Sequence, residues 1–427
     1  MTIGHIYRSL SLGGMQRGAG AILKVHHEMG HKLVVFTREP EDGREYGIGV
    51  PFDRIVVGGG SYMKKASEER VANLRKALQA HPCDIVVHHE YFARSLEGDL
   101  KLLAEMKIPA LVQWHSCFSA LHMLDWWNGQ VCDQFDVVRR FACGVLAFSR
   151  TDCAFFKLIG IPAVRIPYSD PDIFGGAPSH PDGRGCEILW PSRFSAGKRP
   201  LHALMIMEHV LTRCPDARIT MLGDGPERAK LDDYLASRPS LAARVSLPGF
   251  VTDVVPYFRK ADVVLMTTEF EGFCHSIMEA KMAALPVVGY ELDYLDTARP
   301  GTGYVSVPQG DIQAAADMVC GLLEDGAERR RLGALGRRDF EGFASLDQKA
   351  LYEDAFGMAL GGERRETTAD EEEVVLFAPD VLKVLLGHVD AHWRNTKEMA
   401  AFAEERRRRS FLYRVFARLA RCCSGGK

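Results

Sequence analysis

The sequence predicts an α/β protein with two Rossmann-like domains, each a doubly wound parallel sheet, which face a cleft and are followed by a helical tail. Short apolar runs alternate with helix-like segments in the first half, and the same alternation begins again at Glu187. Strands that alternate with helices form parallel sheets covered on both faces. Residues 167–185, rich in Pro, Gly, Asp and Ser, separate the halves and predict a linker and hinge.

The limits of the domains follow from this alternation. The first domain takes residues 1–168, and the second takes 169–360, with a last helix that could return to the first domain. Residues 361–427 form an acidic linker and a basic amphipathic helical tail. The predicted strands are 3–6, 33–36, 55–57, 85–88, 110–114, 144–148 and 164–166 in the first domain, and 188–190, 218–222, 245–247, 263–266, 286–289 and 304–305 in the second.

Composition excludes several classes of protein. With 427 residues, 47% hydrophobic and 26% charged, the chain has the composition of a soluble globular protein of two domains. A net charge of -3 provides no general basic field, so nucleic acid is not an expected partner. The 11 scattered cysteines, and a chain that opens on a strand-like segment, predict a cytoplasmic protein. No apolar run is long enough to span a membrane.

The most informative stretch is 269–289, where a loop and a helix start lie between two predicted strands. Ser276 to Glu279 reads as a capping box, which would make Ser276 the N-cap, put Glu279 in the first helical turn and leave Glu271 in the loop above the strand. A carboxylate at this point can simply cap the helix. It can also bind a ligand, because ligands of open α/β sheets lie beyond the carboxyl ends of the strands, where helix N-termini attract phosphate.

These residues resemble a known family. Glu271 and Glu279, eight positions apart, with Gly272-Phe273 after the first Glu and 286–288 after the helix, resemble the nucleotide-sugar site of the retaining family 4 glycosyltransferases (group 1), which have the GT-B fold. The resemblance implies that Glu279 holds the ribose hydroxyls of the donor and that Glu271 holds the hydroxyls of its sugar. It counts Gly272, Phe273 and Cys274 among the donor-binding residues.

A second pattern in the same half carries positive charge. Arg193 and Lys198 lie five positions apart in the loop after the strand 188–190, and preorganised cations stabilise the charge that grows on a leaving diphosphate. In most loops such residues are solvated. Here they resemble the diphosphate clamp of the family, which also implies that Gly223, Gly225, Phe250 and Val251 lie around the nucleoside.

In the first half the resemblance implies two further contacts with the donor. Gly13 and Gly14 would face the donor diphosphate and sugar, and His115, at the end of a central strand, would contact the hydroxyls of the donor sugar. The following segment contains Asp125, Trp126 and Trp127, residues suited to a sugar acceptor site. An aromatic helix packed on the domain is an equal alternative for this segment.

Two histidine patterns could indicate functional sites but are better interpreted in other ways. His27 to His31 spells HExxH, a zinc-binding motif that needs both histidines on one helical face. Gly30 reads as a helix C-terminus, so His31 should lie outside the helix. His88-His89-Glu90 follows a strand and reads as polar surface on the acceptor side, or as solvated residues.

We therefore expect a retaining glycosyltransferase that moves a sugar from a UDP- or GDP-linked donor to an acceptor hydroxyl of a glycan, lipid-linked molecule or protein, in cell-envelope or polysaccharide synthesis. The resemblance implies same-face attack without a required cofactor or metal. The alternatives are a nucleotide-sugar epimerase or phosphorylase on the same fold, and a non-catalytic nucleotide-sugar-binding partner of another transferase.

The tail predicts a location for such an enzyme. Residues 404–427 place Phe411, Leu412, Val415, Phe416 and Leu419 along one side of a helix and arginines off it. A basic amphipathic helix of this kind lies in the interface of an anionic membrane, which would make the protein peripheral on the inner face of the membrane. The alternative is a helix docked on the enzyme or on a partner subunit.

Overall fold

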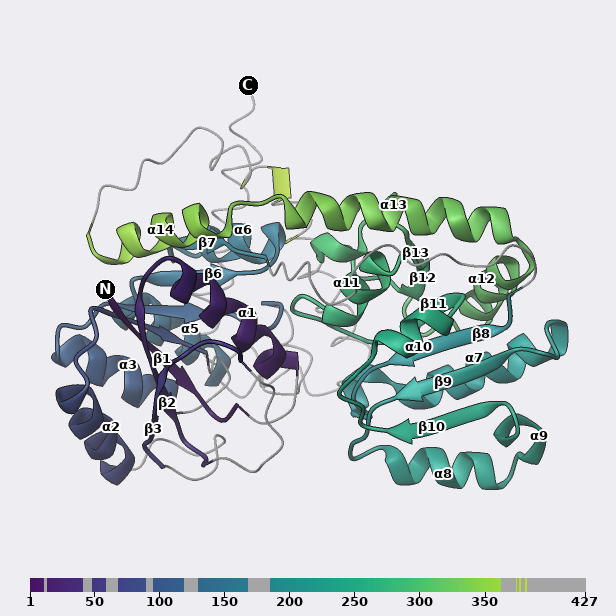
Figure 1. Ribbon diagram of the computed structural model, residues 1–427, viewed down its shortest axis with the longest axis horizontal. Helices are drawn as coiled ribbons and strands as arrows, with labels where there is room; N and C mark the ends of the chain where they lie inside the picture. Colours follow the sequence, from purple (N-terminus) through teal and green to yellow (C-terminus); the bar gives the residue numbers. More distant parts are fainter. Residues whose placement is uncertain are drawn as a thin grey trace, which may run out of the picture. The chain divides into compact units, whose positions relative to one another are not determined.

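The structure is a computed structural model that describes residues 1–10, 14–40, 48–58, 68–89, 95–118, 130–167, 185–361, 374, 376, 377 and 381. The chain divides into two compact units (Figure 1). The first comprises Met1–Tyr168 and Asp347–Lys427, and the second comprises Ser169–Leu346. Residues 347–360, which the sequence pattern counted with the second domain while allowing the last helix to return, group with the first unit.

The first unit is built on a parallel sheet with the strand order β3-β2-β1-β4-β5-β6-β7. Its strands are β1 (Thr2–Tyr7), β2 (Lys32–Thr37), β3 (Asp53–Val56), β4 (Ile85–His88), β5 (Ala110–Gln113), β6 (Gly144–Ala147) and β7 (Ala163–Arg165). Its helices are α1 (Gly14–Glu28), α2 (Glu68–Ala80), α3 (Leu96–Glu105), α5 (Gln130–Phe141), α6 (Arg150–Leu158) and α14 (Gln348–Ala359).

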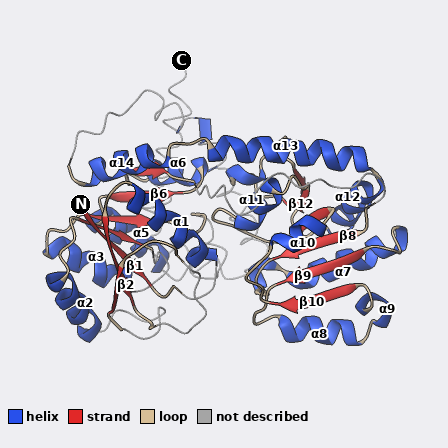
Figure 2. Cartoon of the chain, viewed as in Figure 1, coloured by secondary structure: helices blue, strands red, loops and turns tan. Residues whose placement is uncertain are grey.

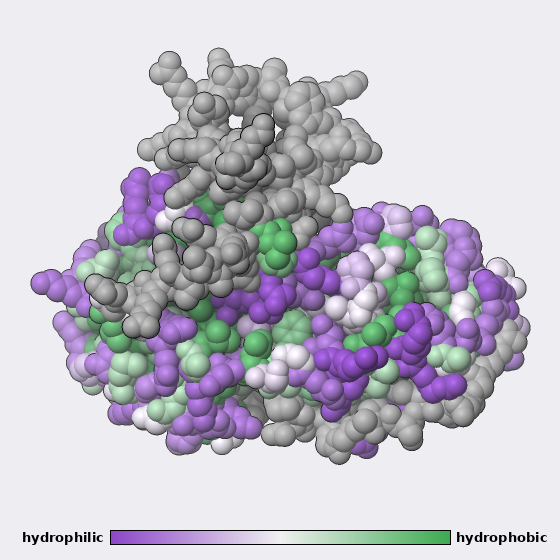
Figure 3. Space-filling view, turned by 90° about the horizontal axis from the view of Figure 1, so that it is seen from above, coloured by the Kyte–Doolittle hydropathy of each residue, from purple (hydrophilic) through white to green (hydrophobic). Residues whose placement is uncertain are grey.

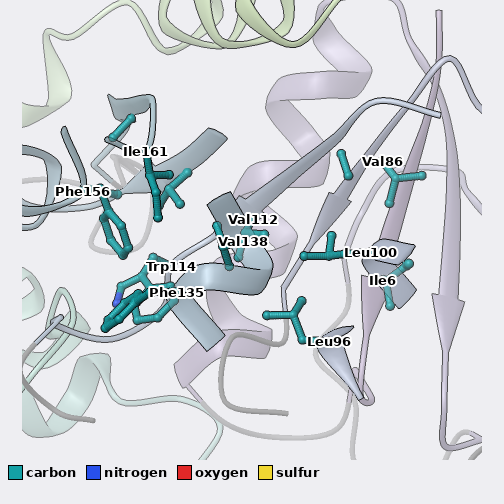
Figure 4. Close-up of a cluster of buried hydrophobic side chains, with 14 of the residues drawn as sticks. Ile6, Val86, Leu96, Leu100, Val112, Trp114, Phe135, Val138, Phe156 and Ile161 are labelled. Atoms are coloured by element: carbon teal, nitrogen blue, oxygen red, sulfur yellow. The ribbon is translucent and has the colours of Figure 1, made fainter. Parts of the chain in front are cut away.

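Alternation along the strands directs successive side chains of this sheet to opposite faces. Ile6 of β1 and Val86 of β4 enter a hydrophobic core with Leu100 of α3, which continues to Trp114 and Phe135 (Figure 4). His5 points the other way, toward α1, whose His26 it contacts. The helix α14 packs against α1, β6 and β7. The first unit therefore has an apolar layer on the α3 face and a layer on the α1 and α14 face that contains buried histidines.

The second unit repeats this plan with the parallel strand order β10-β9-β8-β11-β12-β13. Its strands are β8 (Glu187–Pro191), β9 (Arg218–Leu222), β10 (Val245–Gly249), β11 (Val263–Met266), β12 (Val287–Tyr290) and β13 (Tyr304–Val307). Its helices are α7 (Pro200–Arg213), α8 (Arg228–Ala236), α9 (Pro239–Ala242), α10 (Val255–Lys260), α11 (His275–Met282), α12 (Ile312–Glu324) and α13 (Gly326–Ala344), with 3-10 turns η1 (Ala196–Lys198) and η2 (Asp296–Ala298) (Figure 2).

Every strand that the sequence predicted is present, within two residues at either end. The fully buried strands β4, β5, β6, β11 and β12 have near-continuous apolar sequences, which is why both halves were recognisable as parallel sheets. The prediction of two doubly wound parallel-sheet domains is therefore confirmed.

The short helix α11, which carries Glu279, is fixed by α13. A Cβ added to Gly333 of α13 would lie 1.9 Å from the carbonyl oxygen of Ala284, so only glycine permits this approach. The buried ammonium of Lys281 donates to Asp339 Oδ2 at 2.5 Å, and Arg337 Nη1 donates to the carbonyl of Met282 at 2.7 Å. Backbone, ion pair and helix end thus hold α11 in one position on the second unit.

The surface of the described residues carries few large exposed apolar side chains, and hydrophilic and hydrophobic residues are interspersed in the space-filling view (Figure 3). Among these residues no helix is long and apolar enough to cross a membrane.

Candidate functional site

The loop after β8 supplies the two cations that the sequence singled out. Arg193 is exposed, and its side chain makes no ion pair with the described residues. Lys198 ends η1, and its side chain is 25% exposed. Phe194 between them is buried, and its backbone ties this loop to the next one: its N–H donates to Asp224 O at 3.0 Å, and its carbonyl accepts from Glu227 N at 2.9 Å.

The neighbouring loop after β9 contains Gly223 and Gly225, both with positive φ, at 124° and 157°. A Cβ on Gly223 would lie 2.2 Å from Ser192 O, and one on Gly225 would lie 2.4 Å from Phe194 O. Both contacts are with backbone atoms, which cannot move aside as a flexible side chain can. The glycines therefore allow the loops after β8 and β9 to lie against each other, whatever else they do.

Lys198 and Glu271 form an ion pair, in which Lys198 Nζ donates to Glu271 Oε1. The side chain of Glu271 is only 10% exposed. Their loops are joined by further hydrogen bonds, since Glu269 N donates to Gly197 O at 2.8 Å and the side-chain hydroxyl of Thr267 donates to Lys198 O at 2.8 Å. The structure thus brings together two residues that lie 73 positions apart.

The peptide of Glu271 is held from the other side by Tyr294. Glu271 N donates to the phenol oxygen of Tyr294 at 2.8 Å, and the same hydroxyl donates to Glu271 O at 3.1 Å. A buried residue bonded through both backbone groups and its side chain has little freedom to change conformation. Glu271 is therefore a preorganised carboxylate at the carboxyl end of β11.

The start of α11 differs from the prediction. Its N-cap is Cys274, with φ 63° and ψ 81° and no side-chain cap bond, so the helix begins at His275. Ser276 is consequently inside the helix, and its hydroxyl donates to Pro191 O at 2.6 Å. The predicted capping box is wrong, and Glu279 lies in the second turn, 4% exposed. The left-handed conformation at Cys274 starts the helix two residues early and frees Ser276 to bond β8.

The residues between Glu271 and α11 are buried. Gly272, Phe273 and Cys274 all lie below the surface, and Phe273 packs its ring against His275 and Phe343. Burial, with the nearby Glu271 charge as a second cause, raises the pKa of the Cys274 thiol well above its ordinary value. This thiol is therefore a neutral group at neutral pH.

The last predicted pair lies at the end of β10. Gly223 N donates to Gly249 O at 2.9 Å, which places Phe250 and Val251 directly after the strand beside the glycine loop. The side chain of Phe250 is 45% exposed, which is unusual for a large apolar residue in the described part of the chain. An exposed aromatic ring at this edge is a surface on which a flat ligand could stack.

The described residues of the second unit thus place Arg193, Lys198, Glu271, Glu279 and the glycine loop at the carboxyl edge of one parallel sheet. Two family models match the chain. One, described as "Glycosyl transferases group 1", matches residues 185–325, and the other, described as "Glycosyltransferase Family 4", matches residues 12–167. The chain belongs to glycosyltransferase family 4.

Solved structures of the same fold extend this result. HepE from Anabaena, solved in complex with UDP-glucose, has a TM-score of 0.68 and 16% identity, over 84% of this chain and 99% of that one. TarM from S. aureus, a variant solved with Fondaparinux, alpha-GlcNAc-glycerol and UDP, has a TM-score of 0.69 and 11% identity, over 84% and 100%. The predicted GT-B fold of a family 4 glycosyltransferase is therefore confirmed.

A curated relative matches a shorter stretch. The poly(glycerol-phosphate) alpha-glucosyltransferase of Bacillus subtilis (strain 168) is 30% identical over 139 residues, which are 31% of this chain and 20% of that protein. The chain spans about a fifth of the length of this relative.

The predicted site residues of the first unit are only partly described. His115 lies just beyond β5, half-buried, and its Nε2 is 2.9 Å from Nδ1 of His89. Gly14 begins α1. Gly13, Asp125, Trp126 and Trp127 lie outside the described residues, as do Glu90 and residues 168–184.

The structure decides both histidine patterns. His31 lies outside α1, after Gly30 with φ 79°, so the prediction that HExxH does not continue on one helical face is confirmed. His88 and His89 are both fully buried, so their reading as surface residues is wrong. His88 bonds Asp99 Oδ2 at 2.9 Å on the α3 face, and His89 bonds His5 on the opposite face.

The sequence patterns did not point to two further residues of this candidate site. Arg199, with φ 47°, forms an ion pair with Glu269 at 2.8 Å and donates to Gln309 Oε1 at 3.0 Å. The hydroxyl of Tyr294 bonds both backbone groups of Glu271. Arg199 could have been found as a third cation next to Lys198. No local spacing relates Tyr294 to Glu271, 23 residues away.

Proposed function

We propose that this protein is a retaining glycosyltransferase that moves a sugar from a nucleoside-diphosphate donor to an acceptor hydroxyl. The observation that carries the proposal is the Lys198–Glu271 pair, a cation and a carboxylate at the carboxyl edge of β8 and β11 within the region matched by the family model. A diphosphate needs fixed positive charge, and a sugar needs a hydrogen-bond acceptor beside it. The UDP-glucose bound by HepE supports a nucleotide-sugar donor.

Each site residue then has a proposed role. Lys198 and the exposed Arg193 offset the charge that grows on the leaving diphosphate, and Glu271 accepts hydrogen bonds from the sugar hydroxyls. Glu279 holds the ribose. The proposed nucleoside-binding residues are Gly223, Gly225, Phe250 and Val251, with Gly272, Phe273 and Cys274 beside the donor. The donor-binding residues proposed in the first unit are Gly13, Gly14 and His115.

The proposed reaction needs no covalent enzyme intermediate. The acceptor oxygen attacks the anomeric carbon on the face from which the diphosphate leaves, the bond from that carbon to the phosphate oxygen breaks, and the departing phosphate takes the acceptor proton. The enzyme contributes positioning and electrostatic stabilisation of the leaving group. The donor is UDP- or GDP-linked, and no cofactor or metal is required on this proposal.

A donor panel tests the activity. Purified protein is incubated with UDP- and GDP-linked sugars, free nucleoside diphosphate is measured, and the acceptor product is identified by mass. Release of diphosphate with a sugar added to the acceptor supports the proposal. A changed donor sugar without release indicates an epimerase instead, and donor binding without turnover on any acceptor indicates a non-catalytic partner of another transferase.

The acceptor and the location of the enzyme are part of the same proposal. We propose a glycan or lipid-linked acceptor of the cell envelope, with a protein hydroxyl as the alternative, because TarM was solved with alpha-GlcNAc-glycerol and the Bacillus subtilis relative is a poly(glycerol-phosphate) glucosyltransferase. The protein would work in the cytoplasm at the inner face of the membrane. Its seat there would be residues 404–427, which lie outside the described residues and whose sequence is basic and amphipathic.

Deleting residues 404–427 should leave nucleotide release with a soluble acceptor unchanged and abolish sedimentation with anionic vesicles at low salt. Each arginine near an anionic surface contributes about 1 kcal/mol, and salt screens this attraction. Equal sedimentation of the full and shortened chains, or a shortened chain that does not fold, would favour a docked helix instead.

A further inference from the structure

Four histidines of the first unit form an unbroken chain of ring contacts. His26 of α1 meets His5 of β1, with Nδ1 and Nε2 3.2 Å apart. His5 Nδ1 is 3.0 Å from Nε2 of His89, which follows β4, and His89 Nδ1 is 2.9 Å from Nε2 of His115, which follows β5. At each contact the Nδ1 of one ring faces the Nε2 of the next.

This histidine chain runs from the interior of the first unit to His115, a candidate site residue. His26, His5 and His89 are fully buried, whereas His115 is half-buried. The His89 ring stacks on Tyr7 with centroids 3.9 Å apart and planes 9° apart, and His26 stands edge-on to Tyr352 at 4.2 Å. Aromatic rings therefore enclose the inner part of the histidine chain and keep water from competing for its hydrogen bonds.

Burial keeps the rings of His5, His26 and His89 neutral. It lowers the pKa of His5 to about 3 and that of His26 and His89 well below the ordinary value. Neutral imidazole has one N–H donor and one acceptor nitrogen, so each contact needs one of each. Among the described residues these nitrogens hold one another pairwise and do not converge with other side chains on a metal site.

Only two arrangements of protons satisfy all the contacts. Either every ring carries its proton on Nδ1, or every ring carries it on Nε2. A single ring in the other tautomer would set two N–H groups or two lone pairs against each other, and a buried unsatisfied pair is costly. The tautomers of the four rings are therefore coupled, and the ring of His115 takes the tautomer that the others take.

We propose that His26, His5 and His89 are positioning residues that hold His115 in a single tautomer. They thereby decide whether the Nδ1 of His115 donates or accepts a hydrogen bond toward the donor sugar. The role of His115 in this statement rests on the proposed function, while the coupling itself rests only on the ring contacts. His26 Nε2 is buried with no hydrogen-bond partner among the described residues, so a proton there would be an unsatisfied buried donor, and this favours the arrangement with every proton on Nδ1.

The test is the tautomer of each ring in the full chain, read from long-range proton–nitrogen spectra of protein labelled with ¹⁵N-histidine, without donor. His115 signals are assigned with His115→Gln. We expect all four rings in the same single tautomer, and we expect His115 to become a mixture in His89→Phe, in which phenylalanine keeps the stack on Tyr7. His5→Phe, or His5→Asn if the first does not fold, should have the same effect through His89.

The matched control is His31→Phe in the same unit. The ring of His31 contacts Phe356, as the ring of His26 does, but it takes part in none of the ring contacts of the histidine chain. It should leave the His115 tautomer unchanged. In donor assays, His89→Phe and His5→Phe should lower kcat/KM by roughly two- to ten-fold, the effect of one neutral hydrogen bond, and His31→Phe should not.

An unchanged His115 tautomer in a folded His89→Phe variant, or different tautomers among the four rings of the wild type, would overturn the inference. A protein that shows the coupled tautomers but releases diphosphate from no donor would instead overturn the proposed function. The two failures are therefore distinguishable.

Discussion

The ammonium of Lys198 and the carboxylate of Glu271 neutralise each other across two loops. A ligand that binds Lys198 must therefore compete with Glu271, and a ligand that binds Glu271 must compete with Lys198. Both groups are partly screened, because their side chains are 25% and 10% exposed. Such a pair contributes modestly to stability and strongly to the local field that a charged ligand meets. Glu271 is further fixed by Tyr294, so Lys198 is the member with freedom to turn toward a ligand.

Lys198→Ala should lower kcat for nucleotide release by more than roughly ten-fold, and Arg193→Ala should do the same, because in the proposed reaction both charges would act on the leaving diphosphate. The free energy of unfolding of the Lys198→Ala variant should change by about 1 kcal/mol or less. The measurements are initial rates over a range of donor concentrations and urea melts. A rise in KM alone would make the two residues simple binding groups.

The matched control for Lys198 is Lys230→Ala, which removes an ion pair with Glu227 on the surface of the same unit. Its kinetics should equal those of the wild type. If Lys198→Ala also left the kinetics unchanged, the diphosphate assignment would be lost.

Glu279→Gln should weaken donor binding by about 1.5 to 3 kcal/mol, the contribution of hydrogen bonds to a charged acceptor. The change preserves the shape of a residue that is 4% exposed, so stability should alter much less. Calorimetric titration with the donor measures the first effect and thermal melting the second. Glu324→Gln, which weakens a surface ion pair with Arg213, is the control, and normal donor affinity with a lower Tm in Glu279→Gln would return Glu279 to a structural role.

At the scale of the elements, the site depends on how closely the loops after β8, β9 and β11 approach one another. Two backbone bonds of Phe194 and the close approach at glycines 223 and 225 join the β8 loop to the β9 loop. Hydrogen bonds from residues 267 and 269 join the β8 loop to the β11 loop. The strands place these loops at one edge, and the glycines set the distance between them.

Gly225→Ala should destabilise the second unit by about 1 to 3 kcal/mol or more and reduce activity, because the new Cβ meets the Phe194 carbonyl in a backbone conformation that disfavours side chains. Gly223→Ala should behave likewise. The control is Gly321→Ala in the last turn of α12, where a Cβ has open space and should stabilise the helix by up to about 1 kcal/mol. Equal melting of Gly225→Ala and the wild type would contradict this account.

The elements were predictable where the signal was local. Buried parallel strands such as β11 are visible in the sequence as apolar runs. Gly30, with its positive φ, lies just past the end of α1, as the sequence predicted. The N-terminus of α11 was not predictable, because Ser276 and Glu279 match a capping pattern while the fold places Cys274 in a left-handed conformation. His88 and His89 looked solvated, because a sequence does not show that their partners, Asp99 and His5, come from other elements.

At the scale of the whole molecule, acid should act unevenly on the two units. His5, His26 and His89 have lowered pKa values in the folded first unit, to about 3 for His5, against 6.5 for an ordinary histidine. The unfolded chain therefore takes up protons first as the pH falls below 6.5, and the stability of the first unit falls with it. These three groups give about 4 kcal/mol per pH unit, and His31 and His88 of the same unit, whose pKa values are also lowered, add to this slope.

We expect urea melts between pH 7.5 and 5.0 to show this loss, and hydrogen exchange to reach β1 and β4 before β8 to β13 as the pH falls. His26→Phe removes one titrating ring and should reduce the slope by about 1.4 kcal/mol per pH unit. Stability of the first unit that does not change between pH 6.5 and 5 would show that the buried rings already carry charge when folded.

The first unit is discontinuous in sequence, and α14 reaches it only after the whole second unit. A ribosome that adds roughly 5 to 20 residues per second makes the intervening segment in about 10 to 40 s. During this time the nascent first unit lacks Tyr352 and Phe356, the rings that enclose His26, and the second unit is completed only just before these two residues are added. The order of synthesis thus delays completion of the first unit until the second has been made, and it leaves a half-built first unit as the species that chaperones and proteases meet.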